Sequence, residues 1–244
     1  MPTRRQMLQS IALAAVTTFI SSPLLAEPSQ TSKPLHHDDF SGDLSNWLVQ
    51  QQAGGSVRIN TKGQMEIIDR SGCTIWFKHK LSTPLVIEYD ATVLLKKDPD
   101  GKKADRLSDL NCFWLATDPN APDGSALSKQ RSGKFSDYDD LRLYYVGYGG
   151  NRNTSTRFRR YPGDGSRPLL PEHDLKDARY LNKRGKTLRI KIIADGKTTS
   201  YSRDGEVIFK LEDSDPLTCG HFGFRTVNSH LLIDNFTVSR LPRK

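Results

Sequence analysis

The stretch TLRIKIIADGKTTSYSRDGEVIFKL, residues 187–211, has the clearest β-strand pattern in this chain. Apolar and polar residues alternate in three short runs, 187–194, 197–203 and 206–211, with the period of β-strands that bury one face. The dipeptides Asp195-Gly196 and Asp204-Gly205 separate the runs, and Asp-Gly is a strong signal for a tight hairpin turn. The stretch therefore predicts three consecutive antiparallel strands.

The rest of the chain follows the same plan. Gly149-Gly150 is a third hairpin signal, and no long helical pattern is present. Many short strands joined by hairpins predict an all-β antiparallel sandwich or barrel with minor helix. Nine further candidate strands are 55–60, 65–69, 73–79, 85–95, 111–117, 141–148, 154–161, 221–225 and 231–241. Polar loops are expected over 96–106 and 118–140, and long loops on a sandwich often border binding sites.

The first 26 residues have the features of a twin-arginine export signal. Arg4 and Arg5 precede an apolar run over residues 11–20, and a possible cleavage site ends at Ala26. The run is about half of the roughly 20 residues that a membrane-spanning helix needs. We therefore expect removal of the segment, a periplasmic or secreted bacterial protein, and no stable membrane insertion. The predicted organisation is a signal over 1–26, a polar linker over 27–37 and a single domain over 38–241.

The charge and the cysteines narrow the class of partner. The chain has 36 Lys and Arg against 28 Asp and Glu, a net charge of +8. An exported basic protein meets anionic polysaccharide more often than nucleic acid, so we expect an acidic polysaccharide or oligosaccharide and no nucleic acid. The alternative is that the charge only maintains solubility. Cys73, Cys112 and Cys219 fit neither a disulfide framework nor a zinc site, and we expect small buried hydrophobic side chains.

Several segments together resemble the YesU-like secreted proteins of the concanavalin A-like lectin/glucanase superfamily. They are DDFSGDLSNWLV (38–49), GCTIWFKHKL (72–81), LVIEYDATV (85–93), FWLATDP (113–119), LYYVGYGGNRNTSTRFRRY (143–161) and CGHFGFRTVNSHLLIDNFTV (219–238). The resemblance implies a two-sheet jelly roll whose concave face takes carbohydrate, in bacterial breakdown of polysaccharides. It also favours a site role for Arg225 and His230. The glucanase members carry Glu-x-Asp-x-x-Glu, whereas the matching segment here, from Glu88, lacks the last carboxylate.

The segment 143–161 concentrates tyrosine and arginine on one predicted hairpin. Alternation over 141–148 predicts that Leu141, Leu143 and Tyr145 face the core and that Arg142, Tyr144, Val146 and Tyr148 face outward. In the partner strand, Phe158 is expected in the core, with Arg157, Arg159 and Tyr161 outward. The two outward sets meet across the hairpin, as a binding surface or as a solvated face with Arg–Tyr stacking. Arg160 then falls on the core side, where it needs a buried carboxylate or a sheet end.

Other candidates each have a structural alternative. Glu88 and Asp90 lie on the face of their predicted strand opposite to the core-facing set Leu85, Ile87, Tyr89, Ala91 and Val93. The two expectations for these carboxylates are a role in catalysis and a structural ion pair with the hairpin arginines. Trp76 is a sugar-stacking platform or a core residue. His230 is a site residue or a hydrogen-bonded histidine at a strand start. The run from His36 to Asp39 is expected to be solvated, so we predict no metal and no cofactor.

The predicted chemistry is β-elimination on a uronate-containing saccharide. This reaction needs a cation for the carboxylate, a base for the α-proton and an acid for the leaving oxygen. We assign Arg157 or Arg159 to the carboxylate, Tyr144 or Tyr148 to proton transfer, and His230 as a second proton-transfer candidate. The alternatives are a glycoside hydrolase that uses Glu88 and Asp90, and a non-catalytic carbohydrate-binding module. No nucleophile elbow, phosphate loop or Cys-x-x-Cys is present.

Overall fold

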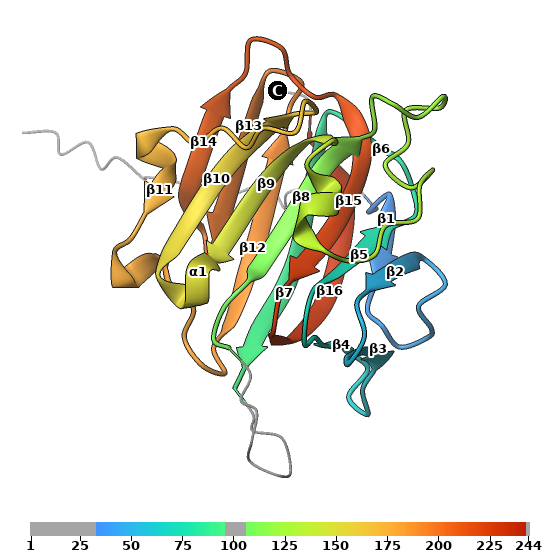
Figure 1. Ribbon diagram of the computed structural model, residues 1–244, viewed down its shortest axis with the longest axis vertical. Helices are drawn as coiled ribbons and strands as arrows, with labels where there is room; N and C mark the ends of the chain where they lie inside the picture. The colour runs from blue at the N-terminus through green and yellow to red at the C-terminus, as the bar shows by residue number, and fades with distance from the viewer. Residues whose placement is uncertain (1–32, 96–105, 243–244) are drawn as a thin grey trace, which may run out of the picture. The chain divides into compact units, whose positions relative to one another are not determined.

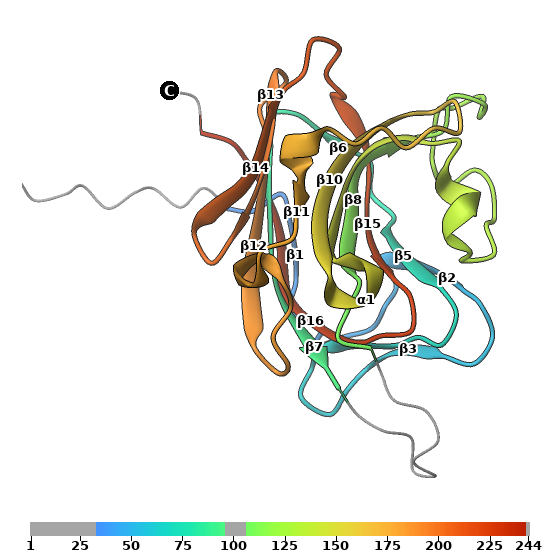
Figure 2. The same cartoon turned by 60° about the vertical axis from the view of Figure 1, so that its left-hand side comes forward.

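The structure is a computed structural model that describes residues 33–95 and 106–242. The predicted export signal and all but the last residue of the predicted loop 96–106 lie outside the described residues. Figure 1 shows two sheets stacked face to face, with all strand pairs antiparallel, and Figure 2 shows them from the side. The all-β antiparallel sandwich with minor helix is therefore confirmed, and each of the twelve predicted strands is present.

The strand order defines the two layers. The first sheet runs β14 (Glu206–Glu212), β13 (Thr198–Arg203), β12 (Thr187–Ala194), β7 (Leu85–Leu94), β16 (His230–Arg240), β4 (Met65–Ile68) and β3 (Ser56–Ile59), with β1 (His36–Asp38) paired to β16. The second sheet runs β11 (Asp174–Leu175), β10 (Ser155–Pro162), β9 (Arg142–Gly149), β8 (Leu110–Thr117), β15 (Cys219–Thr226), β5 (Cys73–Phe77) and β2 (Trp47–Gln51), with β6 (Leu81–Ser82) paired to β15.

Short helical turns lie between the strands, and two of the three predicted hairpin turns are tight. Asp204 and Gly205 have φ of 52° and 83°, as expected for a two-residue hairpin turn, and the Asp195 carboxylate accepts the backbone N–H groups of Lys197 and Thr198. The third turn is wider than predicted, because α1 (Gly150–Asn153) separates β9 from β10. The other short helices among the described residues are the 3-10 helices η1 (Phe135–Tyr138), η2 (Pro171–His173) and η3 (Ala178–Tyr180).

Two hydrophobic cores cover both faces of the second sheet. The main core lies between the sheets and contains the predicted set on β7, together with Cys73 and Cys112. All three cysteines are free, and Cys219 is only partly buried. The second core contains Trp76, Phe113 and Tyr145 from the strands and Tyr138 from η1, so it lies on the outer face of the second sheet. This face is therefore partly covered rather than open to solvent.

The segment 118–141 forms the cover, and a buried arginine organises it. Arg131 is 2% exposed and pairs with Asp118 at 2.7 Å and Asp140 at 3.3 Å, near the two ends of the segment. It also donates to the carbonyl oxygens of Ala126 and Asp137, both at 2.8 Å. Figure 2 shows this yellow-green segment beyond the second sheet, on the side away from the first. The segment thus encloses one side of the site described next.

Candidate functional site

A polar row crosses the outer face of the second sheet. Arg157 on β10 lies opposite Gly147 on β9, which lies opposite Asn111 on β8, which lies opposite Arg225 on β15. Residues that are directly opposite in neighbouring strands point to the same face. The row therefore places two arginines and an amide around a glycine that has no side chain, which leaves space at the centre.

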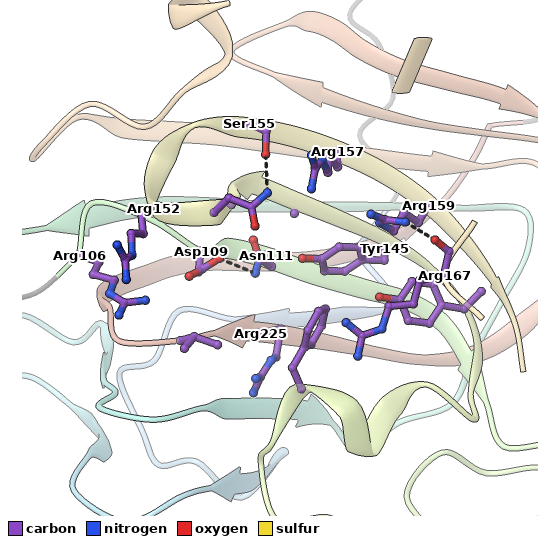
Figure 3. A pocket seen from close by; sticks show the side chains of 16 residues that line it. Arg106, Asp109, Asn111, Tyr145, Arg152, Ser155, Arg157, Arg159, Arg167 and Arg225 are labelled. Carbon is purple, nitrogen blue, oxygen red and sulfur yellow. Dashed lines mark hydrogen bonds between the residues drawn. The ribbon is translucent and has the colours of Figure 1, made fainter. Parts of the chain in front are cut away.

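A cavity of about 410 Å³ lies over this row (Figure 3). It falls within the range of about 300–1,000 Å³ that is typical of small-molecule sites. Its lining has six arginines and one carboxylate: Arg106, Arg152, Arg157, Arg159, Arg167, Arg225 and Asp109. The aromatic residues Phe135, Tyr145 and Tyr161 complete much of the wall. The cavity is thus strongly cationic and has rings on which a sugar can stack.

Two of these arginines already hold a carboxylate from the protein. Arg157 donates through Nε and Nη2 to Asp174, at 2.8 and 3.3 Å. Arg167 uses the same two atoms toward Asp139, at 2.6 and 2.7 Å, while its guanidinium lies 4.4 Å from the centre of the Phe135 ring. These bidentate pairs satisfy the charge of both arginines. They frame the cavity rather than offer a free cation.

Arg225 is different, because the edge of its guanidinium that is formed by Nε and Nη2 has no partner among the described residues. The side chain is 1% exposed, and Nη1 donates to the Gly133 carbonyl oxygen at 2.6 Å. Nε and Nη2 are buried and make no hydrogen bond to any described residue. Burial lowers the pKa of Arg225, although the nearby Tyr138 and Asp69 act to raise it. A buried cation with an unsatisfied bidentate edge is costly on its own.

Arg159 also lacks a carboxylate partner in the part of the chain that the structure describes. Its Nη1 donates to the carbonyl oxygen of Arg167. The residue opposite it in the sheet is Tyr145, and the two charges of Arg159 and Arg225 both act on the Tyr145 hydroxyl. Arg159 and Arg225 are therefore two cations near the Tyr145 hydroxyl that a bound anion can engage.

The Tyr145 hydroxyl lies over Gly147. A methyl group at position 147 would come within 2.5 Å of that oxygen, so the ring extends along β9 into the space that the glycine leaves. Burial raises the pKa of Tyr145 well above its ordinary value, and the neighbouring Tyr161 and Asp109 act in the same direction. Tyr145 therefore keeps its proton at neutral pH and can donate it.

Three further polar groups border the same space. The Tyr161 hydroxyl and the Asn111 Oδ1 are buried without a hydrogen-bond partner among the described residues. Asp109, just before β8, accepts from Ser108 Oγ at 2.9 Å and from Asn111 Nδ2 at 3.3 Å. Burial raises the pKa of Asp109, while those two donors and the charges of Arg225 and Arg106 oppose the rise. The wall thus combines unsatisfied donors and acceptors with one perturbed carboxylate.

The structure corrects the predicted orientation of β9. Tyr144 and Tyr148 do not face outward: both are buried in the main core. The Tyr144 hydroxyl donates to Asp213 at 2.6 Å, and the Tyr148 hydroxyl accepts from Arg203 at 2.7 Å. The outward residues are Leu141, Leu143 and Tyr145, which were predicted to face the core. Val146, which was predicted to face outward, lies in the main core. Because both faces of β9 are covered by apolar side chains, hydrophobic alternation could not decide the phase of this strand.

The other predictions for the hairpin have mixed outcomes. Arg157, Arg159 and Tyr161 line the cavity as predicted for an outward face, and Phe158 lies in the main core. Arg142 lies outside the cavity and pairs with Asp215 at 2.8 Å. The prediction for Arg160 is confirmed, because it pairs with the buried Asp213 at 2.6 Å.

The structure separates the remaining candidates from the cavity. Glu88 and Asp90 lie on β7 in the first sheet, so Glu88 cannot pair with the hairpin arginines; its neighbours are Arg189 at 3.9 Å and Lys191 at 3.8 Å. Asp90 accepts from Asn235 at 2.9 Å.

His230 and Trp76 are also buried away from the ligand space. His230, on β16 of the first sheet, contacts Glu66 Oε1 through Nε2 at 2.8 Å. Trp76 is fully buried in the second core, and its Nε1–H donates to Gln50 at 3.1 Å. It is not an exposed stacking platform, because the segment 118–141 covers its face of the sheet.

Sequence reasoning missed Tyr145, Asn111, Asp109 and Arg167 as lining residues. Asn111 offered a usable signal, since it is the one amide in the otherwise apolar run LNCFWLA, residues 110–116. Arg167 offered none, because it lies in an irregular segment that only the fold brings to the cavity. Asp38 belongs to the run from His36 to Asp39 that was expected to be solvated, but its carboxylate accepts from Trp47 Nε1 at 2.8 Å and β1 pairs with β16, so much of the run is part of the first sheet. Among the described residues, no group of three metal-binding side chains occurs and no helix has the length and apolarity of a membrane span.

Comparison with known proteins identifies a family and a fold. The family profile described as Domain of unknown function (DUF6250) matches residues 67–236, which is more than half of the chain. No curated protein matches the sequence. The YesU-like resemblance stays a prediction.

Solved structures share the concanavalin-like and galectin-like sandwich at low identity. A Bacillus subtilis protein of unknown function with a galectin-like fold has a TM-score of 0.63 and 16% identity, covering 87% of this chain and 98% of its own. The carbohydrate-binding module CBM66 of B. subtilis has a TM-score of 0.53 and 14% identity, covering 80% of this chain and 95% of its own. The Bacillus licheniformis β-glucanase has a TM-score of 0.53 and 11% identity, covering 87% of this chain and 100% of its own. These likenesses support the jelly-roll architecture.

Proposed function

The chain belongs to the DUF6250 family, and we propose that it is an exported protein that binds a uronate-containing saccharide in the arginine-lined cavity and cleaves it by β-elimination. The observation that carries this proposal is the buried, unpartnered Nε and Nη2 edge of Arg225. In the same cavity, Arg157 and Arg167 use that edge to hold carboxylates. A ligand carboxylate is therefore the group that best satisfies Arg225.

The rest of the cavity supports a sugar as the carrier of that carboxylate. Tyr145, Tyr161 and Phe135 supply ring surfaces, and Asn111 Oδ1 can accept from a sugar hydroxyl. The solved structures with the same fold include a carbohydrate-binding module and a glucanase. The net charge of +8 favours an anionic partner, and the twin-arginine features, which lie outside the described residues, favour a partner met after export.

Elimination suits this set of side chains better than hydrolysis does. Arg225 and Arg159 can neutralise the uronate, which makes the α-proton more acidic. Tyr145 is protonated and can protonate the leaving oxygen. Hydrolysis requires two carboxyl groups on either side of one bond, and Asp109 is the single carboxylate among the described lining residues. Glu88 and Asp90 lie in the other sheet.

The test is binding and turnover with oligogalacturonate and oligoalginate, against neutral oligosaccharides of equal length. The unsaturated product of elimination is followed by its ultraviolet absorbance, and hydrolysis by reducing ends alone. Arg159→Gln should weaken binding about 10- to 100-fold, by loss of a charge-assisted pair worth about 1.5–3 kcal/mol. Arg157→Gln should have a smaller effect, since Asp174 already holds Arg157. Added salt should weaken wild-type binding.

Matched tyrosine variants separate an enzyme from a binding module. Tyr145→Phe should abolish turnover and leave affinity nearly unchanged, whereas Tyr148→Phe, on the same strand but in the core, should leave turnover unchanged. Glu88→Gln serves as the control for the hydrolase alternative. Uronate binding without any cleavage would leave a carbohydrate-binding module. Equal affinity for neutral and anionic oligosaccharides would contradict the proposal.

A further inference from the structure

We propose that Asp109 is the base that removes the α-proton, opposite Tyr145 as the acid. This inference rests on the proposed function and names a residue that the sequence patterns did not indicate. Asp109 is the one carboxylate among the described residues that line the cavity. The Asp139 and Asp174 carboxylates, by contrast, are engaged by Arg167 and Arg157 from outside the lining.

The sheet register brings Asp109 and Tyr145 toward the same point. Asn111 lies opposite Gly147, and the Tyr145 hydroxyl lies over Gly147. Asn111 in turn donates to Asp109 Oδ1 at 3.3 Å. Figure 3 shows the Tyr145 hydroxyl pointing toward Asn111, with Asp109 on the other side of the amide. A sugar ring that enters the cavity beside Asn111 would therefore have a carboxylate on one side and a phenol on the other.

The backbone holds Asp109 in an uncommon conformation. Its φ is 60°, in the left-handed region that Asp and Asn adopt more readily than other residues with side chains. Its N–H donates to the Gly149 carbonyl oxygen at 3.3 Å, and Ser108 Oγ donates to Oδ2 at 2.9 Å. Strained backbone positions of this kind persist where the surroundings over-determine them, often at functional sites. The backbone conformation of Asp109 thus helps to fix the direction of its carboxylate.

The electrostatic surroundings suit a base. Asp109 interacts with the charges of Arg225 and Arg106, which both line the cavity, and with the titratable Tyr145 on β9. Arg152 of α1 also lines the cavity. Burial outweighs the arginine charges, so the pKa of Asp109 is raised. A carboxylate with a raised pKa binds a proton more strongly than a free aspartate does. Asp109 is thus suited to accept a proton and Tyr145 to donate one.

The step balances without any further reactant. Asp109 takes the proton from the carbon beside the uronate carboxylate, and the electron pair of that C–H bond forms a double bond to the next ring carbon. The bond from that carbon to the glycosidic oxygen breaks, and its electron pair stays on the oxygen. Tyr145 gives its proton to this oxygen. Transfer of the proton from Asp109 to the Tyr145 phenolate, directly or through water, restores both groups.

Asp109→Asn tests the assignment with little change of structure, because Asn also tolerates the left-handed φ. We expect turnover of the oligouronate that wild type cleaves fastest to fall at least about 100-fold, with affinity within about threefold of wild type. Since the variant loses a desolvated charge, its melting temperature at neutral pH should equal or exceed that of wild type. Arg159→Gln, in contrast, should lose affinity.

Chemical rescue distinguishes a base from a structural residue, because an added small carboxylate can restore turnover only where the missing group took part in proton transfer. Asp109→Gly accepts the same φ and leaves space for a small carboxylate, so added formate should restore part of the lost turnover while added chloride should not. The acidic limb of the wild-type rate profile should lie above the range of an ordinary aspartate, and Asp109→Asn should remove it. Full turnover in Asp109→Asn would overturn this inference and leave the proposed function intact. Binding without cleavage by wild type would overturn the elimination itself.

Discussion

Replacement of Gly147 by alanine tests whether turnover depends on the position of the Tyr145 hydroxyl, which lies over this glycine. The new methyl group would lie 2.5 Å from the Tyr145 hydroxyl oxygen and 2.9 Å from its Cζ atom. Ordinary contact begins near 3.4 Å, so the hydroxyl must withdraw by about 0.9 Å. A displacement of about 1 Å at a reacting group costs on the order of 100-fold in rate. We therefore expect turnover of oligouronate to fall about 100-fold, which is about 2.7 kcal/mol of activation free energy.

The free energy of unfolding should change little in the same variant. Alanine reduces the entropy of the unfolded chain, worth about 0.4–1 kcal/mol, while an off-rotamer Tyr145 costs about 0.5–1.5 kcal/mol. Gly42→Ala is the matched control, because a methyl group there meets no atom within 4 Å and the backbone is not left-handed. Turnover, calorimetric titration and urea denaturation are measured on both variants. Wild-type turnover in Gly147→Ala would refute the role assigned to the Tyr145 hydroxyl.

Three other predictions concern regions outside the cavity. Tyr144→Phe should lower the free energy of unfolding by about 1–3 kcal/mol, by removing the hydroxyl that bonds Asp213 and the Leu217 N–H, and should leave turnover unchanged; a loss of turnover at full stability would contradict this. Burial acts to raise the pKa of Asp213, but hydrogen bonds from Tyr144, the Asp215 backbone and Arg160 outweigh burial and leave the pKa lowered. The ionised Asp213 therefore stabilises the fold above about pH 4, and this stabilisation is lost as the pH falls further. Acid titrations of unfolding should therefore be flatter for Asp213→Asn than for wild type, and identical curves would exclude this role. Changing both Arg4 and Arg5 to lysine should block export, and normal periplasmic accumulation of the mature protein would show that another route suffices.

Much of the site could be anticipated where one face of a strand is distinct from the other. On β10, Phe158 alternates with three polar or amphipathic residues, so the outward position of Arg157, Arg159 and Tyr161 followed from the period of two. Arg160 breaks the pattern, and its pairing with a buried carboxylate was expected for that reason. On β9 the rule failed, because the second core covers the outer face and leaves no polar side to mark it.

Twelve of the sixteen strands in the described residues, the tight Asp-Gly turns and the core face of β7 could be predicted from the sequence, because they depend on local conformation and on alternation within one strand. The strands β1, β2, β6 and β11 were missed. The assignment of strands to sheets became visible in the three-dimensional structure, which places Glu88 in the sheet opposite the arginines. The tertiary structure also decided that Trp76 is covered, that Arg225 is buried with one edge unpartnered, and that Asp109 and Tyr145 border one cavity. These relations join residues far apart in the chain, and the register between strands and the path of the segment 118–141 are set by packing of the whole domain.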